Sequence, residues 1–390
     1  MQWHYKHTVL ALCALAFFAT MVARLAISPV VPEIRVAFGV SNAVVGLALT
    51  GLWMAYFLAQ FPSGVLADRY GERSIILLSL GGTAVASLAI ALSPTFVVFV
   101  LATLALGALA GLHYSVGTTL LSRTHDDVGT AIGVHTAGGP AAGIAAPVVA
   151  AWIGPRFGWE PAVAIGAVTA AIVFVLFSRF VRPTPPQRPD QPMGERFEPG
   201  ALVELLSRPP IAFAVVCSIL AAFAWQATAS FLPTFLVEQR GLSTGAAGGA
   251  FSAYFLVQGV SSPVVGAASD RYGRDVTTAS LLAIGAVGFV VLVAVPGWPA
   301  IAVAVVALGV GLGWAAAFLP RFFDAFTEME AGAGFGLVRT VYGLIGALGS
   351  VVTGFLADQY GWTVAFAVLA GLLVIVCAIL VGNRLLGTGY

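Results

Sequence analysis

Residues Gly64–Arg73 read GVLADRYGER, and residues Gly266–Arg274 read GAASDRYGR. Both stretches hold a glycine, three further residues and then Asp-Arg-Tyr-Gly, with an arginine close behind. The aspartates of the two copies, Asp68 and Asp270, lie 202 residues apart. Each copy follows one long apolar stretch and precedes another. A motif that recurs in the same setting predicts a chain built from two related halves.

Other features repeat at nearly the same spacing. Phe157-Gly158-Trp159 matches Tyr360-Gly361-Trp362 at a displacement of 203 residues. Between these motifs and the first pair, Gly129, Gly133 and Gly143 match Gly332, Gly336 and Gly346 at the same displacement. A constant displacement over this length indicates duplication. Trp159 and Trp362 each begin an apolar stretch and are candidates for anchors at the membrane interface.

The composition places the chain in lipid. Of its 390 residues, 59% are hydrophobic and only 9% are charged, whereas a soluble domain carries roughly 25% charged residues. The 45 glycines fit a bilayer, where small residues let helices approach closely. A net charge of +1 gives no electrostatic case for a nucleic-acid partner. The three cysteines lie in apolar runs without metal-site spacing, so we expect no metal and no cofactor.

Twelve stretches are long and apolar enough to cross a bilayer, which takes about 20 residues per helix. They cover residues 8–36, 41–68, 74–92, 95–122, 128–153, 160–181, 210–237, 244–269, 276–295, 299–326, 332–356 and 362–384. We therefore predict an all-α integral membrane protein with two pseudo-symmetric six-helix bundles, residues 1–182 and 210–390. A proline-rich cytoplasmic linker, residues 183–209, joins them, and a short amphipathic helix is expected at 198–207. Repeats that share one orientation place a solute site at the midplane, between the halves.

Basic residues set the orientation, because cytoplasmic loops are enriched in lysine and arginine. With both termini inside, twelve basic residues lie on the inner side, and Arg35, Arg156 and Arg240 lie on the outer side. The inner set is Lys6, Arg69, Arg73, Arg123, Arg179, Arg182, Arg188, Arg196, Arg208, Arg271, Arg274 and Arg384. We predict a multi-pass protein of the plasma membrane with both termini in the cytoplasm.

The Gly64–Arg73 segment resembles the loop signature of the major facilitator superfamily, G-x-x-x-D-R/K-x-G-R/K-R/K. It lies where this family has it, between spans two and three, and the second copy lies between spans eight and nine. The resemblance covers essentially the whole chain and implies alternating access, in which two six-helix bundles rock about a central cavity. Two positions depart from the pattern: Glu72 replaces the first of the final basic pair in the first copy, and Asp275 replaces the last basic residue in the second copy.

In the superfamily this loop acts as a latch on the cytoplasmic side, so the resemblance implies a gating role for both copies. The gating candidates are Gly64, Asp68, Arg69, Gly71, Arg73, Gly266, Asp270, Arg271 and Gly273. Gly71 and Gly273 are expected to permit a tight turn, and Gly64 and Gly266 a close helix contact. The two aspartates can accept hydrogen bonds from a neighbouring helix N-terminus. The alternative is a loop that only sets topology.

Arg24 lies near mid-depth of the first span, where a charge is costly and usually faces a cavity. A guanidinium offers a fixed fork of donors, so Arg24 is a candidate clamp for an anion or a carboxylate. The alternative is an arginine paired with backbone or with an acid of another span.

Two branches of the superfamily carry arginines within their spans. The organophosphate branch has one in span one and another in span seven, where this chain has Trp225 and Gln226. The nitrate/nitrite branch has arginines in spans two and eight. Those spans here carry Tyr56, Gln60, Tyr254 and Gln258. The resemblance therefore assigns neither branch.

Polar and aromatic side chains within the spans are candidates for lining a substrate cavity. Together with Arg24 they are Trp53, Tyr56, Gln60, His113, Trp225, Gln226, Tyr254, Gln258, Trp314 and Tyr342. His113 and His135 are also candidates for carrying a coupling proton, because histidine titrates near neutral pH. The alternative for each histidine is a neutral ring that bonds a neighbouring carbonyl or hydroxyl group.

A charged cluster lies near the inner ends of spans ten and eleven. Its members are Arg321, Asp324, Glu328, Glu330 and Arg339. Arg321 and Asp324 are three residues apart on one helix face and can pair. We interpret the cluster as an ion-pair network or inner gate, with Arg321, Asp324 and Arg339 as gating candidates, and substrate binding as the alternative.

These features predict a secondary transporter that moves a small solute by alternating access, through proton coupling or exchange. The solute is expected to be an anion or a carboxylate-bearing organic compound. Export of a drug or metabolite is the alternative, and a non-transporting membrane receptor is another. The chain has no Walker-type G-x-x-x-x-G-K-[ST] loop for ATP and no nucleophile–base constellation of an enzyme. The expected partners are a small-molecule substrate, membrane lipid and a coupling proton, with the protein as a monomer.

Overall fold

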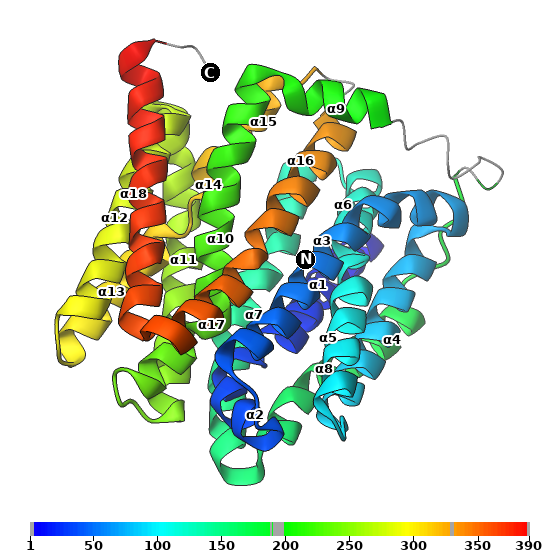
Figure 1. Cartoon of the computed structure of the whole chain (residues 1–390). Helices are drawn as coiled ribbons and strands as arrows, with labels where there is room; N and C mark the ends of the chain where they lie inside the picture. The colour runs from blue at the N-terminus through cyan, green and yellow to red at the C-terminus, as the bar shows by residue number, and fades with distance from the viewer. Residues whose placement is uncertain (1–3, 188, 190–198, 328–330, 388–390) are drawn as a thin grey trace. The chain divides into compact units, whose positions relative to one another are not determined.

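The computed structural model describes residues 4–187, 189, 199–327 and 331–387. It is 88% helical, and the described residues contain no strand. Twelve helices or helix groups are long and apolar enough to cross a membrane. The predicted all-α membrane fold with twelve spans is thereby confirmed (Figure 1).

The first six spans are formed by nine helical segments. They are α1 (Tyr5–Leu25), η1 (Ser28–Val30) and α2 (Val31–Phe38) in span one, α3 (Asn42–Tyr70), α4 (Glu72–Ala91), α5 (Phe96–Gly111) with α6 (His113–Thr124), α7 (Val128–Phe157) and α8 (Trp159–Phe180). Span one is divided into these three segments near Pro29 and Pro32, because proline cannot donate to the helical ladder. Span four is interrupted at Leu112, directly before His113.

The second half repeats this plan after a short helix. That helix is α9 (Pro199–Ser207), followed by α10 (Pro209–Glu238), α11 (Thr244–Tyr272), α12 (Arg274–Ala294), α13 (Trp298–Gly311) with α14 (Ala315–Phe318) and α15 (Pro320–Ala325), α16 (Ala331–Gly346) with α17 (Leu348–Tyr360), and α18 (Trp362–Leu386). The helix predicted at 198–207 is therefore present. Arg188, Arg196, Glu328, Glu330 and linker residues 190–198 lie outside the described residues.

The chain forms two compact units. The first consists of Met1–Val40, Gly51–Phe197 and Ser243–Gly248, and the second of Ser41–Thr50, Glu198–Leu242 and Gly249–Tyr390. The first turns of α3 thus belong to the second unit, and the first turn of α11 belongs to the first. The division predicted at residues 183–209 stays a prediction.

Glycines bring helices of the first unit into backbone contact. A methyl group at Gly107 or Gly111 of α5 would lie 2.0 or 2.3 Å from a backbone oxygen of α3, and one at Gly138 of α7 would lie 2.5 Å from a backbone oxygen of α1. Gly64 and Gly266 do not have this role, because a methyl group at either would meet no atom within 4 Å in the described structure. The expectation of close packing at these two glycines was therefore wrong.

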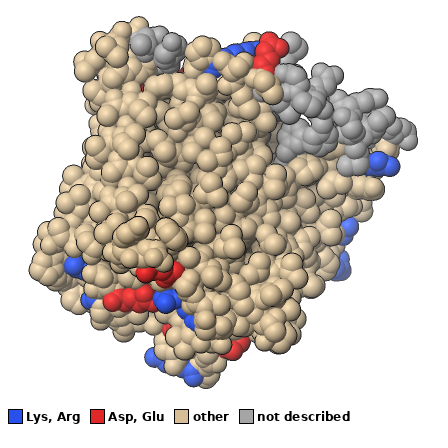
Figure 2. Space-filling model, viewed as in Figure 1, with Lys and Arg blue, Asp and Glu red and all other residues tan. Residues whose placement is uncertain are grey.

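The two tryptophans expected at the membrane interface are buried. Trp159 and Trp362 are each 6% exposed. The Trp362 indole donates a hydrogen bond of 2.8 Å to the Glu238 carboxylate, which satisfies the N–H inside the protein. The face of the molecule in Figure 2 is dominated by uncharged residues, with charged ones in small groups.

Candidate functional site

The Arg24 guanidinium is held between helices of the first unit. Arg24 is only 3% exposed, and its Nε donates a hydrogen bond of 3.0 Å to the backbone oxygen of Thr20. The guanidinium carbon lies 3.9 Å from the centre of the Tyr56 ring and 5.1 Å from that of Trp53. Aromatic faces attract a cation without removing its formal charge. The site therefore keeps a positive charge within the first span.

Gln60 extends this site along α3. Trp53, Tyr56 and Gln60 are three and four residues apart, so they share one face of the helix. Gln60 is 6% exposed, and its amide nitrogen is buried without a hydrogen-bond partner among the described residues. A buried donor of this kind is uncommon and calls for a partner. The structure thus groups four predicted residues of the first unit around a cation and an amide donor.

The two buried histidines of the first unit meet at one backbone oxygen. His113 Nε2 lies 3.2 Å and His135 Nδ1 lies 3.1 Å from the carbonyl oxygen of Cys13 in α1. The ring centres are 5.2 Å apart, and both side chains are fully buried. The predicted alternative, a ring bonded to a neighbouring carbonyl, matches this state of the protein.

The predicted residues of the second unit form contacts of their own. The rings of Trp314 and Tyr342 pack edge to face with their centres 6.1 Å apart. Gln258 donates hydrogen bonds to the backbone oxygen of Leu312, at 3.0 Å, and to the hydroxyl of Tyr254, at 3.3 Å.

Two further candidates lie on α10. Gln226 is buried and donates to the backbone oxygen of Gly343 at 3.2 Å. Trp225 is half-buried and lies 6.4 Å from the Phe255 ring.

The first signature loop is fixed by contacts with α6 and with the segment after α8. Arg73 donates to the backbone oxygens of Val181, at 2.8 Å, and Ser178, at 2.6 Å, which places a cation at the C-terminal end of α8. Glu72 is buried and pairs with Arg123 of α6. The departure from the family pattern at Glu72 thus supplies the partner of an arginine in span four.

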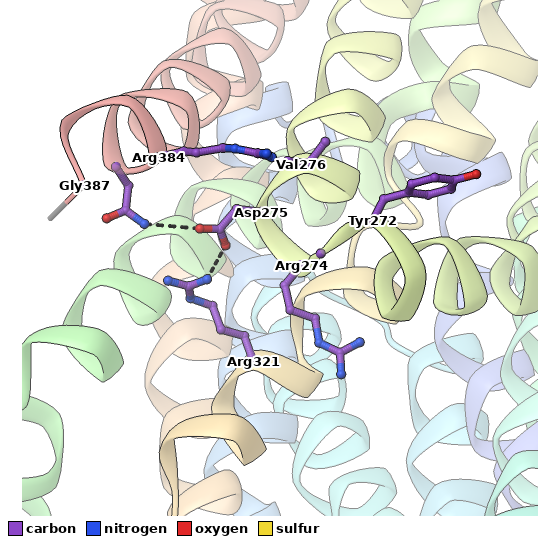
Figure 3. A pocket seen from close by; sticks show the side chains of 9 residues that line it. Tyr272, Arg274, Asp275, Val276, Arg321, Arg384 and Gly387 are labelled. Atoms are coloured by element: carbon purple, nitrogen blue, oxygen red, sulfur yellow. Dashed lines mark hydrogen bonds and ion pairs between the residues drawn. The ribbon is translucent and has the colours of Figure 1, made fainter. Parts of the chain in front are cut away.

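The second loop also contains an ion pair between an acid and an arginine of a later helix, formed by different residues. Asp275 pairs with Arg321 of α15 (Figure 3) and accepts a hydrogen bond of 3.2 Å from the Asn383 amide. Arg274 pairs with Asp270 and with Asp324. The expected pair of Arg321 with Asp324 is therefore replaced by two pairs that both reach the start of α12.

An open cavity of about 400 Å³ lies at this end of the second unit. It is lined by residues of the α11–α12 turn, α15 and α18, among them Arg274, Arg321 and Arg384 (Figure 3). Asp275 lies between Arg321 and Asn383 at its wall. Of the other gating candidates, Asp68 and Arg339 are half-buried, and Arg69 and Arg271 are exposed.

Sequence reasoning missed the groups that hold the histidines. The carbonyl of Cys13 carries no side-chain signal, so nothing in the sequence marks it as the common acceptor. Gly117 lies one helical turn after His113, and a methyl group there would be 3.1 Å from His113 Cε1 and 3.2 Å from His135 Cε1. A glycine four residues from a buried histidine was the available signal.

Comparison with known proteins places the chain among transport proteins. The sequence matches the Major Facilitator Superfamily model over residues 13–252 and 214–385. It is 26% identical over 379 residues to a Pseudomonas aeruginosa protein named "Transcription regulatory protein OpdE", covering 94% of this chain and 90% of the relative. It is 25% identical over 380 residues to the "Hexuronate transporter" of Bacillus subtilis, covering 90% and 88%.

The fold matches a solved transporter structure. A bacterial homologue of the human lysosomal transporter Spinster, in an inward-facing and unoccupied conformation, aligns with a TM-score of 0.81 at 16% identity and covers 97% of both chains. At this identity the likeness concerns the fold.

Proposed function

Because the chain belongs to the major facilitator superfamily, we propose that it moves a small anion or a carboxylate-bearing organic compound across the membrane by alternating access. Membership makes the protein a multi-pass membrane transporter of small solutes and not an enzyme. The observation that carries the finer proposal is the buried guanidinium of Arg24. A carboxylate matches the fork of N–H donors on arginine.

The surroundings of Arg24 support an organic anion. Trp53 and Tyr56 offer apolar faces beside the cation, and Gln60 offers a buried amide donor on the same helix face. A ligand with a carboxylate and hydroxyl groups would use both kinds of contact. The relative named as a hexuronate transporter makes glucuronate a suitable first probe.

The remaining assignments complete the proposal. Trp225, Gln226, Tyr254, Gln258, Trp314 and Tyr342 are the second unit's candidates for contacts with the solute, and the residues of the two loops, with Arg321, Asp324 and Arg339, are the candidates for gating. A proton is the proposed coupling ion, with His113 and His135 as its carriers. The protein is proposed to be a monomer of the plasma membrane with both termini in the cytoplasm.

Uptake of labelled glucuronate into proteoliposomes tests the substrate class. We expect uptake by the wild type to fall at least about tenfold in Arg24→Ala, and Arg24→Lys to restore only part of it because lysine lacks the fork. Arg156→Ala is the control, since Arg156 is exposed. Equal transport by Arg24→Ala and the control would end the role of Arg24, and failure of a wider panel of anions would end the substrate class.

A regulatory role in place of transport is the second candidate. The relative named as a transcription regulatory protein covers nearly the whole chain. A chain that binds its solute but transports none of it in proteoliposomes would favour this role over transport.

A further inference from the structure

The shared carbonyl of Cys13 fixes the protonation pattern of the two buried histidines. A carbonyl oxygen accepts hydrogen bonds and never donates. The nitrogens that face it, Nε2 of His113 and Nδ1 of His135, must therefore carry their protons. In the neutral rings, Nδ1 of His113 and Nε2 of His135 are then bare.

Both bare nitrogens are buried without a hydrogen-bond partner among the described residues. A proton added to either would create an N–H group with nothing to receive it. A buried donor without an acceptor destabilises the conformation that contains it. Proton uptake by the pair therefore favours a conformation other than the one described.

The Cys13 oxygen faces more hydrogen-bond donors than it has lone pairs. It has two lone pairs, and its position in α1 also makes it the acceptor of the helical N–H four residues on. Three donors thus compete for it. If one imidazole is released, the helical N–H and the other imidazole still occupy both lone pairs of the carbonyl oxygen. Losing one of the two imidazole hydrogen bonds therefore costs little.

The surroundings limit the pair to one positive charge. The ring centres are 5.2 Å apart, and Phe17 packs 5.3 Å from His135 and 6.3 Å from His113. Two imidazolium charges this close, next to an aromatic ring, would repel with little screening. Gly117 leaves just enough space for both rings, since a methyl group there would lie 3.1 and 3.2 Å from their Cε1 atoms.

Few ionisable groups face the pair in the described part of the chain. From α1 they are the Cys13 thiol and, three helical turns further along, Arg24, and from α6 it is Tyr114, 5.9 Å from His135. On α4, Glu72 is paired with Arg123 of α6, and Arg73 bonds the backbone after α8. Neither α7 nor α8 presents a charge to the rings by any contact described. The positive charge of Arg24 adds to the case against a second proton.

We propose that His113 and His135 form a single-proton site. Proton uptake releases one imidazole from the Cys13 oxygen and so allows α1 to shift. Cys13 and Arg24 are eleven residues apart, three helical turns, which puts them on one face of the helix at about 16 Å. Because α1 is one continuous helix over Tyr5–Leu25, a shift at Cys13 moves Arg24. The coupling role rests on the proposed function, since Arg24 is its proposed anion clamp.

Proton counting by histidine NMR tests the site without any substrate. The full chain in lipid nanodiscs, with His4, His7 and His125 changed to glutamine and the remaining histidines labelled with ¹⁵N, is titrated between about pH 4 and pH 8. We expect the pair to take up one proton per chain, and His113→Gln or His135→Gln also to take up one. Two protons in the parent chain, or none, would overturn the proposal.

A glycine pair provides the structural control for the same titration. Gly117→Ala should shift the resonances and the titrations of both rings together, because its methyl group would make a close steric contact with each ring. Gly133→Ala on α7, where a methyl group would meet no atom of the described residues within 4 Å, should shift neither. A response of only one ring to Gly117→Ala would show that the two histidines are separate sites.

Transport then tests the coupling. With glucuronate as the probe, single histidine variants should show about tenfold less accumulation driven by a pH gradient, within the usual range of coupling between sites, and Gly133→Ala should accumulate as much as the wild type. Accumulation equal to the wild type in the histidine variants would refute coupling through the pair. A wild type that moves no glucuronate would count against the proposed substrate, and the NMR titration would still decide the single-proton site.

Discussion

The carboxylate of Asp358 in α17 caps the first turn of α3. It accepts hydrogen bonds from the backbone N–H groups of Asn42, at 3.1 Å, and Ala43, at 2.7 Å, and from the Asn42 side-chain amide at 2.9 Å. All of these residues belong to the second compact unit. A methyl group at Gly354 would lie only 2.4 Å from the Asn42 backbone oxygen, so the two helices also touch directly.

Removing this cap should destabilise the packing of α3 on α17. Asp358→Ala leaves the first N–H groups of α3 without an acceptor, at a cost of about 1 kcal/mol. Asp358→Asn keeps one acceptor and should cost less. Thermal unfolding in detergent measures both, with Glu204→Ala on the exposed face of α9 as the control. A loss no greater than that of the control would contradict the capping role.

The two signature glycines differ in a way that substitution can measure. Both have positive φ, +83° at Gly71 and +95° at Gly273, in a region that non-glycine residues occupy at a cost of about 1–3 kcal/mol. A methyl group at Gly71 would also lie 2.3 Å from the Thr184 backbone oxygen, whereas one at Gly273 would meet no atom within 4 Å in the described part of the chain. Gly71→Ala should therefore lower the unfolding temperature more than Gly273→Ala. Equal losses would mean that the Thr184 contact is absent in the membrane.

Removing one partner of the Glu72–Arg123 pair should lower the stability of the protein more than replacing both partners. The Glu72 side chain is 3% exposed and that of Arg123 is 40% exposed. Arg123→Ala leaves a buried carboxylate, with an expected loss of roughly 1–3 kcal/mol after allowing for the exposed arginine. Glu72→Gln combined with Arg123→Gln should recover part of it. A double-mutant cycle that gives additive losses would argue against the pair.

Tyr56 should act on the candidate site through its ring and not its hydroxyl. Tyr56→Phe keeps the aromatic face under Arg24, and Tyr56→Leu removes it, with an expected loss of about 1–2 kcal/mol. The apparent affinity for a transported anion should fall about five- to thirtyfold in the leucine variant and change little in the phenylalanine variant. Equal effects in both variants would instead assign the role to the hydroxyl.

Asp127 makes the start of α7 sensitive to acid. It accepts hydrogen bonds from the Thr130 backbone N–H, at 3.2 Å, and hydroxyl, at 2.7 Å, and the Thr130 side chain lowers the pKa of this exposed carboxyl. Because the folded pKa is the lower one, the stabilisation is present above the ordinary pKa of about 3.9 and is lost as the pH falls through the lowered value. Asp127→Ala should reduce the unfolding temperature at neutral pH and converge with the wild type in acid. Asp126→Ala is the adjacent control, and a constant difference at every pH would contradict the assignment.

The candidate sites could be predicted from the sequence only in part. The sequence indicates Arg24, Trp53, Tyr56 and Gln60 because they are polar or aromatic within apolar spans, and α1 and α3 bring the first three into contact. The ion pairs do not follow from the sequence in this way, because Arg321 has a nearby acid in Asp324 but pairs with Asp275 of another span. Side chains pair across helices according to packing, which local spacing does not contain.

What the sequence determined by itself was the number of spans, the duplication and the need for glycine at the two loop turns. Those features are local: about 20 apolar residues make a span, and a positive φ selects glycine within a single turn. The tertiary structure decided which glycines touch a neighbouring helix and which acid meets which arginine. It also decided that His113 and His135 share the backbone oxygen of Cys13. A backbone carbonyl is the same in every residue, so only the packing of α1, α6 and α7 could select that one.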